Sequence, residues 1–475
     1  MVQDDDSSFH RDNAITSPQK TSHEFRVKSR CCETGRRRGI HTIIMYTFIY
    51  NTLLAVVLLV MTPWYGWRVL VSGKYRTSTG PKLGFHAPGT FDGLAGSPRI
   101  WIHAVSVGEV TAAAPIVAGL RKICPEAVIF LSTSTETGQE AARRLVPHVS
   151  TLFYFPLDIP RVIRGVLDQI NPDLFVIVET ELWPNFIRVC RERSVKVIMV
   201  NGRLSPRSFR KYRATRFFWK GVLEKVTAAG VISETDRSRL TRIGMEPGRI
   251  DVMGNAKYDG LVERTRSDLR DETARLLDMN GRDPVIVAGS THEGEEVILI
   301  DLYERFRASM PNLRLILVPR HVHRVGNIVS ILRERGLPSA FFSDIEAGRA
   351  DGRTPVVVVD VMGRLFSLYG IATVVFCGGS MVPRGGQNVL EAAAWGKVVL
   401  HGTSMEDFAE EGRLLAEAGA AIPVGNREEL AEHMERLLAD REERIRRGQA
   451  GRRVVEENQG AARRYAEMIL RNCIR

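Results

Sequence analysis

Short apolar runs alternate with amphipathic stretches over most of the chain, from Arg99 onward. The runs are rich in Val, Ile and Leu, and in order they read IWIHAV, AVIFLST, LFVIVET, VKVIMVN, AAGVIS, PVIVAGS, LRLILVP, TPVVVVD, ATVVFCGGS and KVVLHG. Segments with helical periodicity, such as EVTAAAPIVAGLRKI and EEVILIDLYERF, separate them. Strands that are apolar throughout, with helices between them, are typical of parallel sheets covered on both faces. The pattern therefore predicts an α/β fold.

A charged stretch over residues 261–283, which contains the turn signal NG and is followed by Pro, divides the apolar runs into two series. A chain of 475 residues also exceeds what one hydrophobic core supports. We expect two Rossmann-like domains, over residues 98–265 and 266–475, with helices at the end of the second. If these domains face each other across a cleft, ligands would bind at the carboxyl ends of the strands.

The segment from Ile40 to Trp67 contains no Lys, Arg, Asp or Glu and has a strongly apolar centre. It meets the length of about 20 residues that a helix needs to cross a bilayer, and its aromatic end resembles an interfacial belt. A cleaved signal peptide is the alternative, but no small-residue cleavage site follows. We expect a disordered basic extension over residues 1–39, a membrane anchor over 40–67 and a linker over 68–97. Basic residues flank both ends of the segment, so their charge does not indicate its orientation.

The chain is basic, with a formal net charge of +11. Nucleic acid, anionic lipid and phosphorylated substrates would all gain from such a field. The basic residues are spread through both halves without interleaved aromatic residues, which disfavours a nucleic-acid platform. The six cysteines show no CxxC pair and no zinc-ligand spacing, which disfavours a disulfide scaffold and favours a reducing, cytoplasmic-side location.

Two acidic motifs follow predicted strands. Glu109 closes the sequence SVGE after IWIHAV, where an ionised carboxylate could accept a proton from a sugar hydroxyl. Ser106 with a Glu three residues later is also a capping box, so helix capping is the alternative for this motif. Glu179 and Glu181 follow LFVIVE, and clustered acids are costly without partners. Glu179 could therefore orient or tune Glu109.

A basic group occupies loops after later predicted strands. Arg203 lies in NGRLSPRS, Lys257 in GNAKYD, and Arg320 with His321 and His323 in LVPRHVHR. Each alone would be a solvated surface charge in most proteins. Together they favour anion binding, because a leaving nucleotide phosphate requires positive charge directed at it.

Glycines mark a further candidate site in GGS at residues 378–380 and in GGQNVLE at residues 385–391. Glycines before a helix suit a sugar nucleotide, and Glu391 could accept two ribose hydroxyls, although glycines also simply make turns. His292 and Glu293 lack the HExxH spacing of a metal site, and a cleft-lining or capping role is the simpler interpretation. The one Asp-rich run, residues 4–6, precedes the predicted domains. We therefore expect a transferase that uses no metal and no other cofactor.

Several specific strings occur together in order: HAVSVGE, FPLDIP, ETELWPN, NGRLSPRS, GNAKYD, GSTHEGEE, LVPRHVHR and GGQNVLEAAAWG. With them the chain, from about Tyr46 to Ala466, resembles the 3-deoxy-D-manno-octulosonic acid (Kdo) transferase family of lipopolysaccharide biosynthesis. The resemblance implies a GT-B fold, in which the first domain binds the acceptor and the second binds CMP-Kdo.

The resemblance also implies roles for individual residues. Glu109 would be the proton acceptor, and Glu179 and Lys257 would stabilise the transition state. The implied contacts to CMP are Pro319, Arg320, Met362, Gly363, Arg364, Asn388, Val389, Leu390 and Glu391. Two positions depart from the family pattern, because Arg364 stands where an acidic residue is common and Gln387 where His is common.

The expected function is therefore an inverting transfer of Kdo from CMP-Kdo to a lipid A precursor, a tetraacyl disaccharide bisphosphate, with release of CMP. The protein would be held in the inner membrane by one anchor segment, with its catalytic domains on the cytoplasmic side. Nucleic acid is not an expected partner. Two alternatives stay open: another GT-B enzyme acting on UDP-sugars, and a non-catalytic, membrane-anchored binder of sugar nucleotides.

Overall fold

The structure is a computed structural model that separates into two units, Met1–Lys74 and Tyr75–Arg475. The residues it describes are 45, 47–64, 66, 67, 71, 76–279, 281 and 283–473. The predicted extension over residues 1–39 lies outside them, as does the first part of the predicted anchor. Thr47–Trp64 form a helix with a mean hydropathy of 1.6, and it is unburied, long enough and apolar enough to cross a membrane. This helix is consistent with a single membrane anchor.

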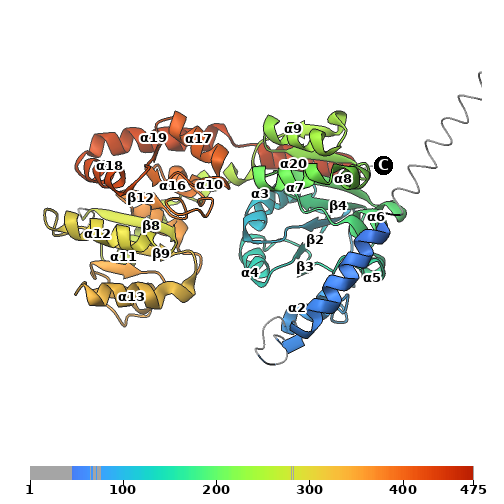
Figure 1. The fold of residues 1–475 in the computed structure, drawn as a ribbon, viewed down its shortest axis with the longest axis horizontal. Coiled ribbons are helices and arrows are strands. Elements are labelled where there is room, and N and C mark those ends of the chain that lie inside the picture. Colours follow the sequence, from blue (N-terminus) through green and yellow to red (C-terminus); the bar gives the residue numbers. More distant parts are fainter. Residues whose placement is uncertain are drawn as a thin grey trace, which may run out of the picture. The chain divides into compact units, whose positions relative to one another are not determined.

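The second unit contains two parallel sheets (Figure 1). The first has the strand order β3-β2-β1-β4-β5-β6-β7. Its strands are β1 Arg99–His103, β2 Val128–Thr133, β3 Thr151–Tyr154, β4 Leu174–Val178, β5 Lys196–Gly202, β6 Ala228–Val231 and β7 Ile250–Val252. The helices between and around them are α2 Arg76–Lys82, α3 Val107–Ile123, α4 Glu136–Leu145, α5 Pro160–Ile170, α6 Pro184–Glu192, α7 Pro206–Ala214, α8 Arg216–Leu223 and α9 Glu234–Ile243.

Strand β4 explains why the sheet is covered on both faces. All five of its residues are buried. Phe175 and Ile177 belong to one hydrophobic cluster, whereas Leu174, Val176 and Val178 belong to the other. Successive side chains of a strand point to opposite faces, so an uninterrupted apolar sequence requires helices on both sides.

The second sheet repeats this architecture with the order β10-β11-β9-β8-β12-β13-β14. Its strands are β8 Val285–Thr291, β9 Arg314–Pro319, β10 Ser339–Phe341, β11 Val356–Val358, β12 Val374–Cys377, β13 Val399–His401 and β14 Ala421–Pro423. Its helices include α11 Ser267–Leu276, α12 Glu295–Arg307, α13 Val325–Glu334, α14 Phe342–Glu346, α15 Leu365–Ile371, α16 Leu390–Ala394, α17 Ala409–Glu417, α18 Arg427–Ala439 and α19 Arg441–Glu457. The predicted α/β class with two Rossmann-like sheets is confirmed.

The last helix, α20 (Ala461–Cys473), returns to the first sheet (Figure 1). Its buried face belongs to the same hydrophobic cluster as α3 and strands β1 and β2. The two helices touch at Gly119 of α3, where a Cβ would be in van der Waals contact with the Cβ of Ala466, 3.4 Å away. The expected second domain, 266–475, therefore differs from the structure at its end, because the apolar stripe of α20 fits the small-residue face of α3. The other predicted boundaries stay predictions.

Each sheet has a point where the direction of strand succession reverses. In the first sheet this point lies between β1 and β4, and in the second between β8 and β12. Loops that leave such strands at their carboxyl ends diverge, which opens a crevice for ligands. The acidic and glycine-containing motifs identified in the sequence follow these four strands.

Candidate active site

Glu109 lies in the first turn of α3, directly after the loop that leaves β1. Its Oε2 accepts a hydrogen bond from the backbone N–H of Val105. Ser106, at the N-cap, makes no capping hydrogen bond with its side chain. In a capping box the glutamate would accept from the N-cap N–H of Ser106, so neither hydrogen bond of the box forms, and helix capping does not account for the position of Glu109.

Burial raises the pKa of Glu109 to about 8, and the negative charges of Glu179 and Glu181 act in the same direction. The Val105 N–H and the Lys257 ammonium oppose this shift. The side chain is 9% exposed. A carboxylate in this environment is a much stronger base than an ordinary glutamate, once it is ionised.

Glu179 follows β4 and has a left-handed backbone conformation, with φ of 60°. For a residue with a Cβ this conformation costs about 1–3 kcal/mol, and such outliers cluster at functional sites. Its Oε1 accepts a hydrogen bond of 2.7 Å from Nζ of Lys257, and both side chains are largely shielded from solvent. The structure thus brings together the carboxylate and the ammonium that the resemblance paired.

Lys257 is held by a chain of asparagine contacts. Its backbone N–H donates to Oδ1 of Asn255 at 3.0 Å, and the N–H of Ala256 donates to Oδ1 of Asn201 at 2.8 Å. Asn255 also donates from Nδ2 to Oε1 of Glu411 in α17, at 2.9 Å. The segment that presents Lys257 is therefore fixed to the end of β5 and to a helix of the second sheet.

A cavity of about 490 Å³ lies between loops of the two sheets within the second unit. Glu109, Glu179 and Arg203 contribute from the first sheet, and Arg320 and Gln387 contribute from the second. The remaining lining residues are Ser106, Gly108, Thr180, Glu181, Leu204, Ser205, Ser208, Tyr212, Gly386, Asp407 and Phe408. Its wall is predominantly polar, which suits a sugar bearing many hydroxyls and a phosphate.

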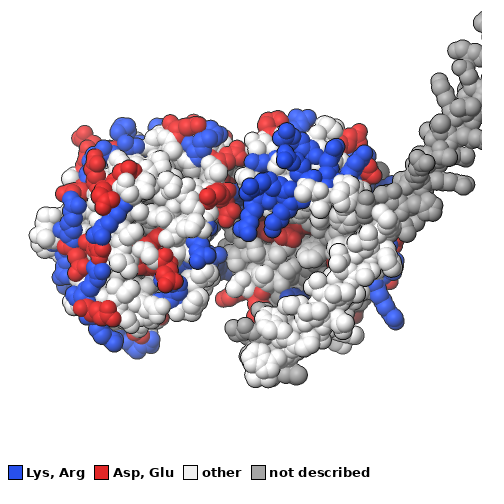
Figure 2. All heavy atoms as spheres, in the orientation of Figure 1, with Lys and Arg blue, Asp and Glu red and all other residues white. Residues whose placement is uncertain are grey.

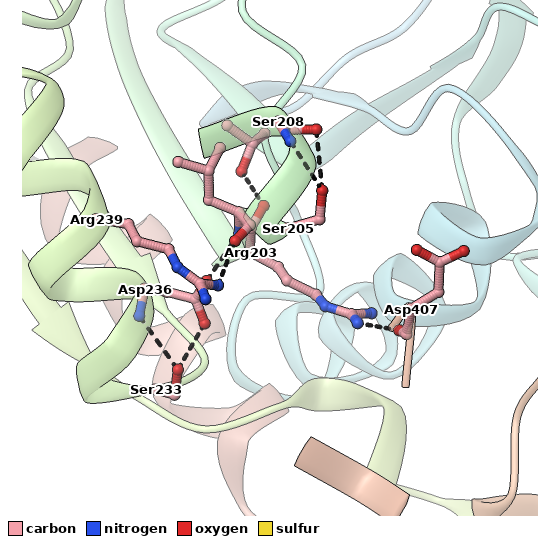
Figure 3. A network of polar contacts seen from close by, with 9 residues as sticks. Arg203, Ser205, Ser208, Ser233, Asp236, Arg239 and Asp407 are labelled. Carbon is pink, nitrogen blue, oxygen red and sulfur yellow. Dashed lines mark hydrogen bonds and ion pairs between the residues drawn. The ribbon is translucent and has the colours of Figure 1, made fainter. Parts of the chain in front are cut away.

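Arg203 crosses from the first sheet to the loop before α17. Its guanidinium donates to the backbone carbonyl of Asp407 (Figure 3). The same group lies 5.9 Å from the centre of the Phe408 ring. Sequence reasoning assigned Arg203 to anion binding. The structure instead commits one of its donors to a contact that joins the two halves of the cavity wall.

The loop after Arg203 is fixed by a buried network (Figure 3). Asp236 accepts hydrogen bonds from the backbone N–H of Leu204 at 2.8 Å and from the hydroxyl of Ser233 at 2.6 Å. Arg239 donates to the carbonyl of Leu204 at 2.6 Å. Because backbone donors and acceptors of the loop are both engaged, Arg203 starts from a rigid base.

Helix α7 contributes residues that sequence reasoning missed. Ser208 and Tyr212 are four positions apart and line the cavity. Burial and the charge of Glu181 raise the pKa of Tyr212 to about 12, which keeps its hydroxyl protonated as a donor. The helical spacing of these two polar residues in PRSFRKYRA was the available signal.

The outer face of this region is strongly basic. Figure 2 shows Lys and Arg side chains gathered over α7, α8 and α9. The basic residues of α7 and α8 are exposed, and they are Arg207, Arg210, Lys211, Arg213, Arg216 and Lys220. A surface of this kind attracts phosphate groups and anionic lipids.

In the second sheet, Glu295 organises the glycine loop after β12. Its two oxygens accept N–H donors from His292 at 2.9 Å, Gly379 at 2.8 Å, Ser380 at 3.0 Å and Met381 at 3.0 Å. Sequence reasoning gave the surrounding motif only a general cleft-lining or capping role. Four backbone donors on one buried carboxylate make Glu295 a structural residue that shapes the loop.

The residues implied as CMP contacts do not all meet in one cavity. Arg320 lines the cavity with Glu109, immediately after Pro319 at the end of β9. Residues 362–364, on another loop, and residues 388–391, at the start of α16, do not line it. The side chain of Arg364 forms an ion pair with Glu346. At this departure from the family pattern, the side chain is thus engaged with the protein itself, as expected if the position contacts its ligand through the backbone.

Residues 388–391 start α16. Oδ1 of Asn388 accepts the N–H of Leu390 at 3.1 Å, and burial raises the pKa of Glu391 against the opposing charges of Arg264 and Arg144. Elsewhere, His321 stacks on His323 with ring centres 5.5 Å apart. In the described part of the chain, no group of three or more His, Cys, Asp or Glu side chains is arranged to hold a metal ion.

Comparison with known proteins adds independent information. Residues 77–260 match the family described as 3-deoxy-D-manno-octulosonic-acid transferase (kdotransferase). The chain is 31% identical to a 3-deoxy-D-manno-octulosonic acid transferase of Haemophilus influenzae, over 90% of this chain and 98% of that protein. It is 28% identical to the transferase of the same name from Chlamydophila psittaci, over 92% and 98%.

Solved structures agree on the fold. A glycosyltransferase from Rickettsia africae superposes with a TM-score of 0.53 at 14% identity, over 79% of this chain and 98% of that one. At this identity the likeness concerns architecture alone, and it supports the predicted GT-B arrangement.

Proposed function

The chain belongs to the 3-deoxy-D-manno-octulosonic acid (Kdo) transferase family, glycosyltransferases of lipopolysaccharide synthesis, and from this premise we propose that it moves Kdo from CMP-Kdo to a lipid A precursor and releases CMP. The observation that carries the proposal is Glu109, a shielded carboxylate of high pKa in the wall of a polar cavity, beside the Glu179–Lys257 pair.

In this proposal Glu109 is the general base. It removes a proton from the 6'-hydroxyl of the acceptor disaccharide as that oxygen attacks the anomeric carbon of Kdo. The bond from this carbon to the CMP phosphate breaks at the same time, so the configuration at the anomeric centre is inverted. A base whose pKa lies near the working pH can accept the proton efficiently, and its raised pKa supports this role for Glu109.

Lys257 and Arg320 supply the positive charge that the departing phosphate needs. Lys257 is oriented by its 2.7 Å contact with Glu179, whereas Arg320 lies exposed at the second-sheet side of the cavity. Charges that are held in position before the reaction stabilise the transition state without reorganisation. The negative charge of Glu179 repels that of ionised Glu109, but Glu179 also holds the Lys257 ammonium close to Glu109. The positive charge of Lys257 offsets part of this repulsion.

The acceptor side is supported by the basic surface of α7 and α8. Ser208 and Tyr212 face the cavity from α7, while the basic residues of the same helix are exposed. An acylated, bisphosphorylated disaccharide at a membrane surface matches this distribution of charge. The apolar helix Thr47–Trp64 is consistent with a single membrane anchor. In this proposal the anchor holds the protein in the inner membrane, and the catalytic domains work on the cytoplasmic side.

The direct test incubates the purified full chain in detergent with CMP-Kdo and tetraacyl disaccharide bisphosphate. We expect acceptor whose mass has risen by one or more Kdo residues, equimolar CMP, and an inverted anomeric centre by NMR. A retained anomeric configuration would contradict the single displacement. No product with CMP-Kdo, but product with a UDP-sugar, would refute the donor assignment.

A further inference from the structure

Arg144 occupies the last turn of α4, on the first sheet, and its side chain is exposed. Its guanidinium nevertheless lies directly against the backbone of Gly363, in the loop between β11 and α15 of the second sheet. A Cβ added to Gly363 would collide with the guanidinium. An arginine of one sheet therefore reaches a loop of the other and lies in the space that a side chain at position 363 would occupy.

The same guanidinium acts on a second segment of that sheet. The charge of Arg144 opposes the rise in the pKa of Glu391, the carboxylate at the start of α16. The cation with the larger effect, Arg264, belongs to α10 (Leu261–Arg264) and lies 4.3 Å from the ring centre of Phe366. Glu391 thus experiences the charge of one arginine that stacks on an aromatic ring and of a second arginine that comes from the first sheet.

We propose that Arg144 is a nucleotide-positioning residue: a guanidinium supplied by the first sheet that contacts the CMP part of the donor between Gly363 and Glu391. This inference rests on the proposed function, since Gly363 and Glu391 are the residues expected to bind CMP. No residue of the first sheet was among those expected contacts.

The chemistry of arginine suits this role. A guanidinium offers five N–H donors in a planar fork, which matches a phosphate or a pair of ribose oxygens. Gly363 has a φ of 87°, so both its backbone conformation and the lack of a Cβ favour glycine at this position. A nucleotide held between Glu391 and Arg144 would be in contact with both sheets, so that donor binding would fix the position of Glu109 relative to the sugar.

The alternative is that Arg144 is an ordinary solvated residue at a helix C-terminus, where basic side chains are favoured. Arg143 is the matched control for this alternative. It precedes Arg144 in the same last turn, is also exposed, and has the same charge. The three atoms nearest to a Cβ at Gly363 all belong to Arg144.

The experiment measures transfer kinetics against CMP-Kdo, and CMP affinity by calorimetry, in the full chain and in R144M, R144K and R143M. We expect R144M to raise KM for CMP-Kdo and the Kd for CMP about tenfold, as loss of a charged hydrogen-bonding group does. R144K should recover part of the loss because it restores charge without the planar fork. R143M should match the unaltered chain, and all four proteins should melt alike.

Two failures can be told apart. If the unaltered chain neither binds CMP nor uses CMP-Kdo, the proposed function is wrong. If the unaltered chain does both while R144M equals R143M in KM and Kd, the positioning role is wrong and the proposed function stands. An equal fall in kcat for R144M and R144K at unchanged KM and Kd would likewise overturn it, because a nucleotide contact must alter nucleotide affinity.

Discussion

Each of the two sheets has a buried glutamate at the start of the helix after its first strand, and the two glutamates have different surroundings. Glu109 and Glu295 each lie in the first turn of the helix that follows the first strand of their sheet, at the point where strand succession reverses. Both are buried, with exposed fractions of 9% and 0%. Glu295 accepts four backbone N–H donors, whereas Glu109 accepts one and has two carboxylates as neighbours.

The difference shows that position in the fold does not decide what a carboxylate does. Backbone donors satisfy Glu295 and make it part of the loop it shapes. Glu109 is shielded from water and lies close to two other carboxylates, and both effects raise its affinity for a proton. A buried carboxylate is therefore a candidate base when its partners are few and negative, and a structural residue when they are many and N–H donors.

The largest effect should come from removing the base. E109Q keeps the shape of the side chain but cannot accept the proton, so transfer should fall by about 100-fold or more. The matched control is E136Q, because Glu136 also lies in the first turn of a helix, α4, but is exposed and outside the cavity. Initial rates of CMP release measure both, and near-normal turnover by E109Q would reject the role of Glu109.

The corresponding substitution at Glu295 should destabilise the folded state. E295Q turns an amide NH2 toward backbone N–H groups, and we expect a loss of about 2–3 kcal/mol of unfolding free energy, because buried donors lose their acceptor. E293Q is the control, since Glu293 is exposed on the same loop. Denaturant unfolding followed by circular dichroism measures this. Equal stability of the two variants would show that Glu295 is not the organiser of the loop.

Removing Lys257 should have an intermediate effect. K257M leaves Glu179 without its partner and takes away a charge that lowers the pKa of Glu109. We expect transfer to slow about tenfold and the pH dependence of the rate to move to higher pH. K122M, at an exposed position near the end of α3, should change neither. A slower K257M enzyme with an unmoved pH profile would contradict the coupling of Lys257 to Glu109.

The smallest effect concerns stability. The pKa of Glu109 is about 8 in the folded protein, above its ordinary value of 4.5, so the folded state binds the proton more tightly than the unfolded state. This contribution is present below the lower value and is lost as pH rises toward 8. E109Q should therefore be more stable than the unaltered chain at pH 8, by about 1–2 kcal/mol. Lower stability of E109Q at pH 8 would mean that the ionised carboxylate is stabilised by its surroundings.

Most of the fold could be predicted from the sequence because the inner strands are apolar on both faces. The strands that were missed are β3, β7, β10 and β14, and all four lie at the edges of their sheets. An edge strand needs less apolar sequence, and β7 and β10 contain only three residues each. The return of α20 was missed for a different reason, since its partner α3 lies more than 300 positions earlier in the chain.

The site was predictable where its residues follow strands directly, as Glu109 and Glu179 do. The cavity wall formed by Tyr212, and the contact of Arg203 with Asp407, depend on how separate loops meet. The distinction between Glu109 and Glu295 could not be read from the sequence either. It depends on which backbone N–H groups surround each carboxylate.

The pH dependence of kcat/KM for Kdo transfer tests the central claim most directly. With Glu109 as the base, the rate should rise about tenfold per pH unit below an apparent pKa near 8, and E109Q should lose this rise along with most of its activity. A rate that stays level between about pH 6 and pH 9 would contradict the account.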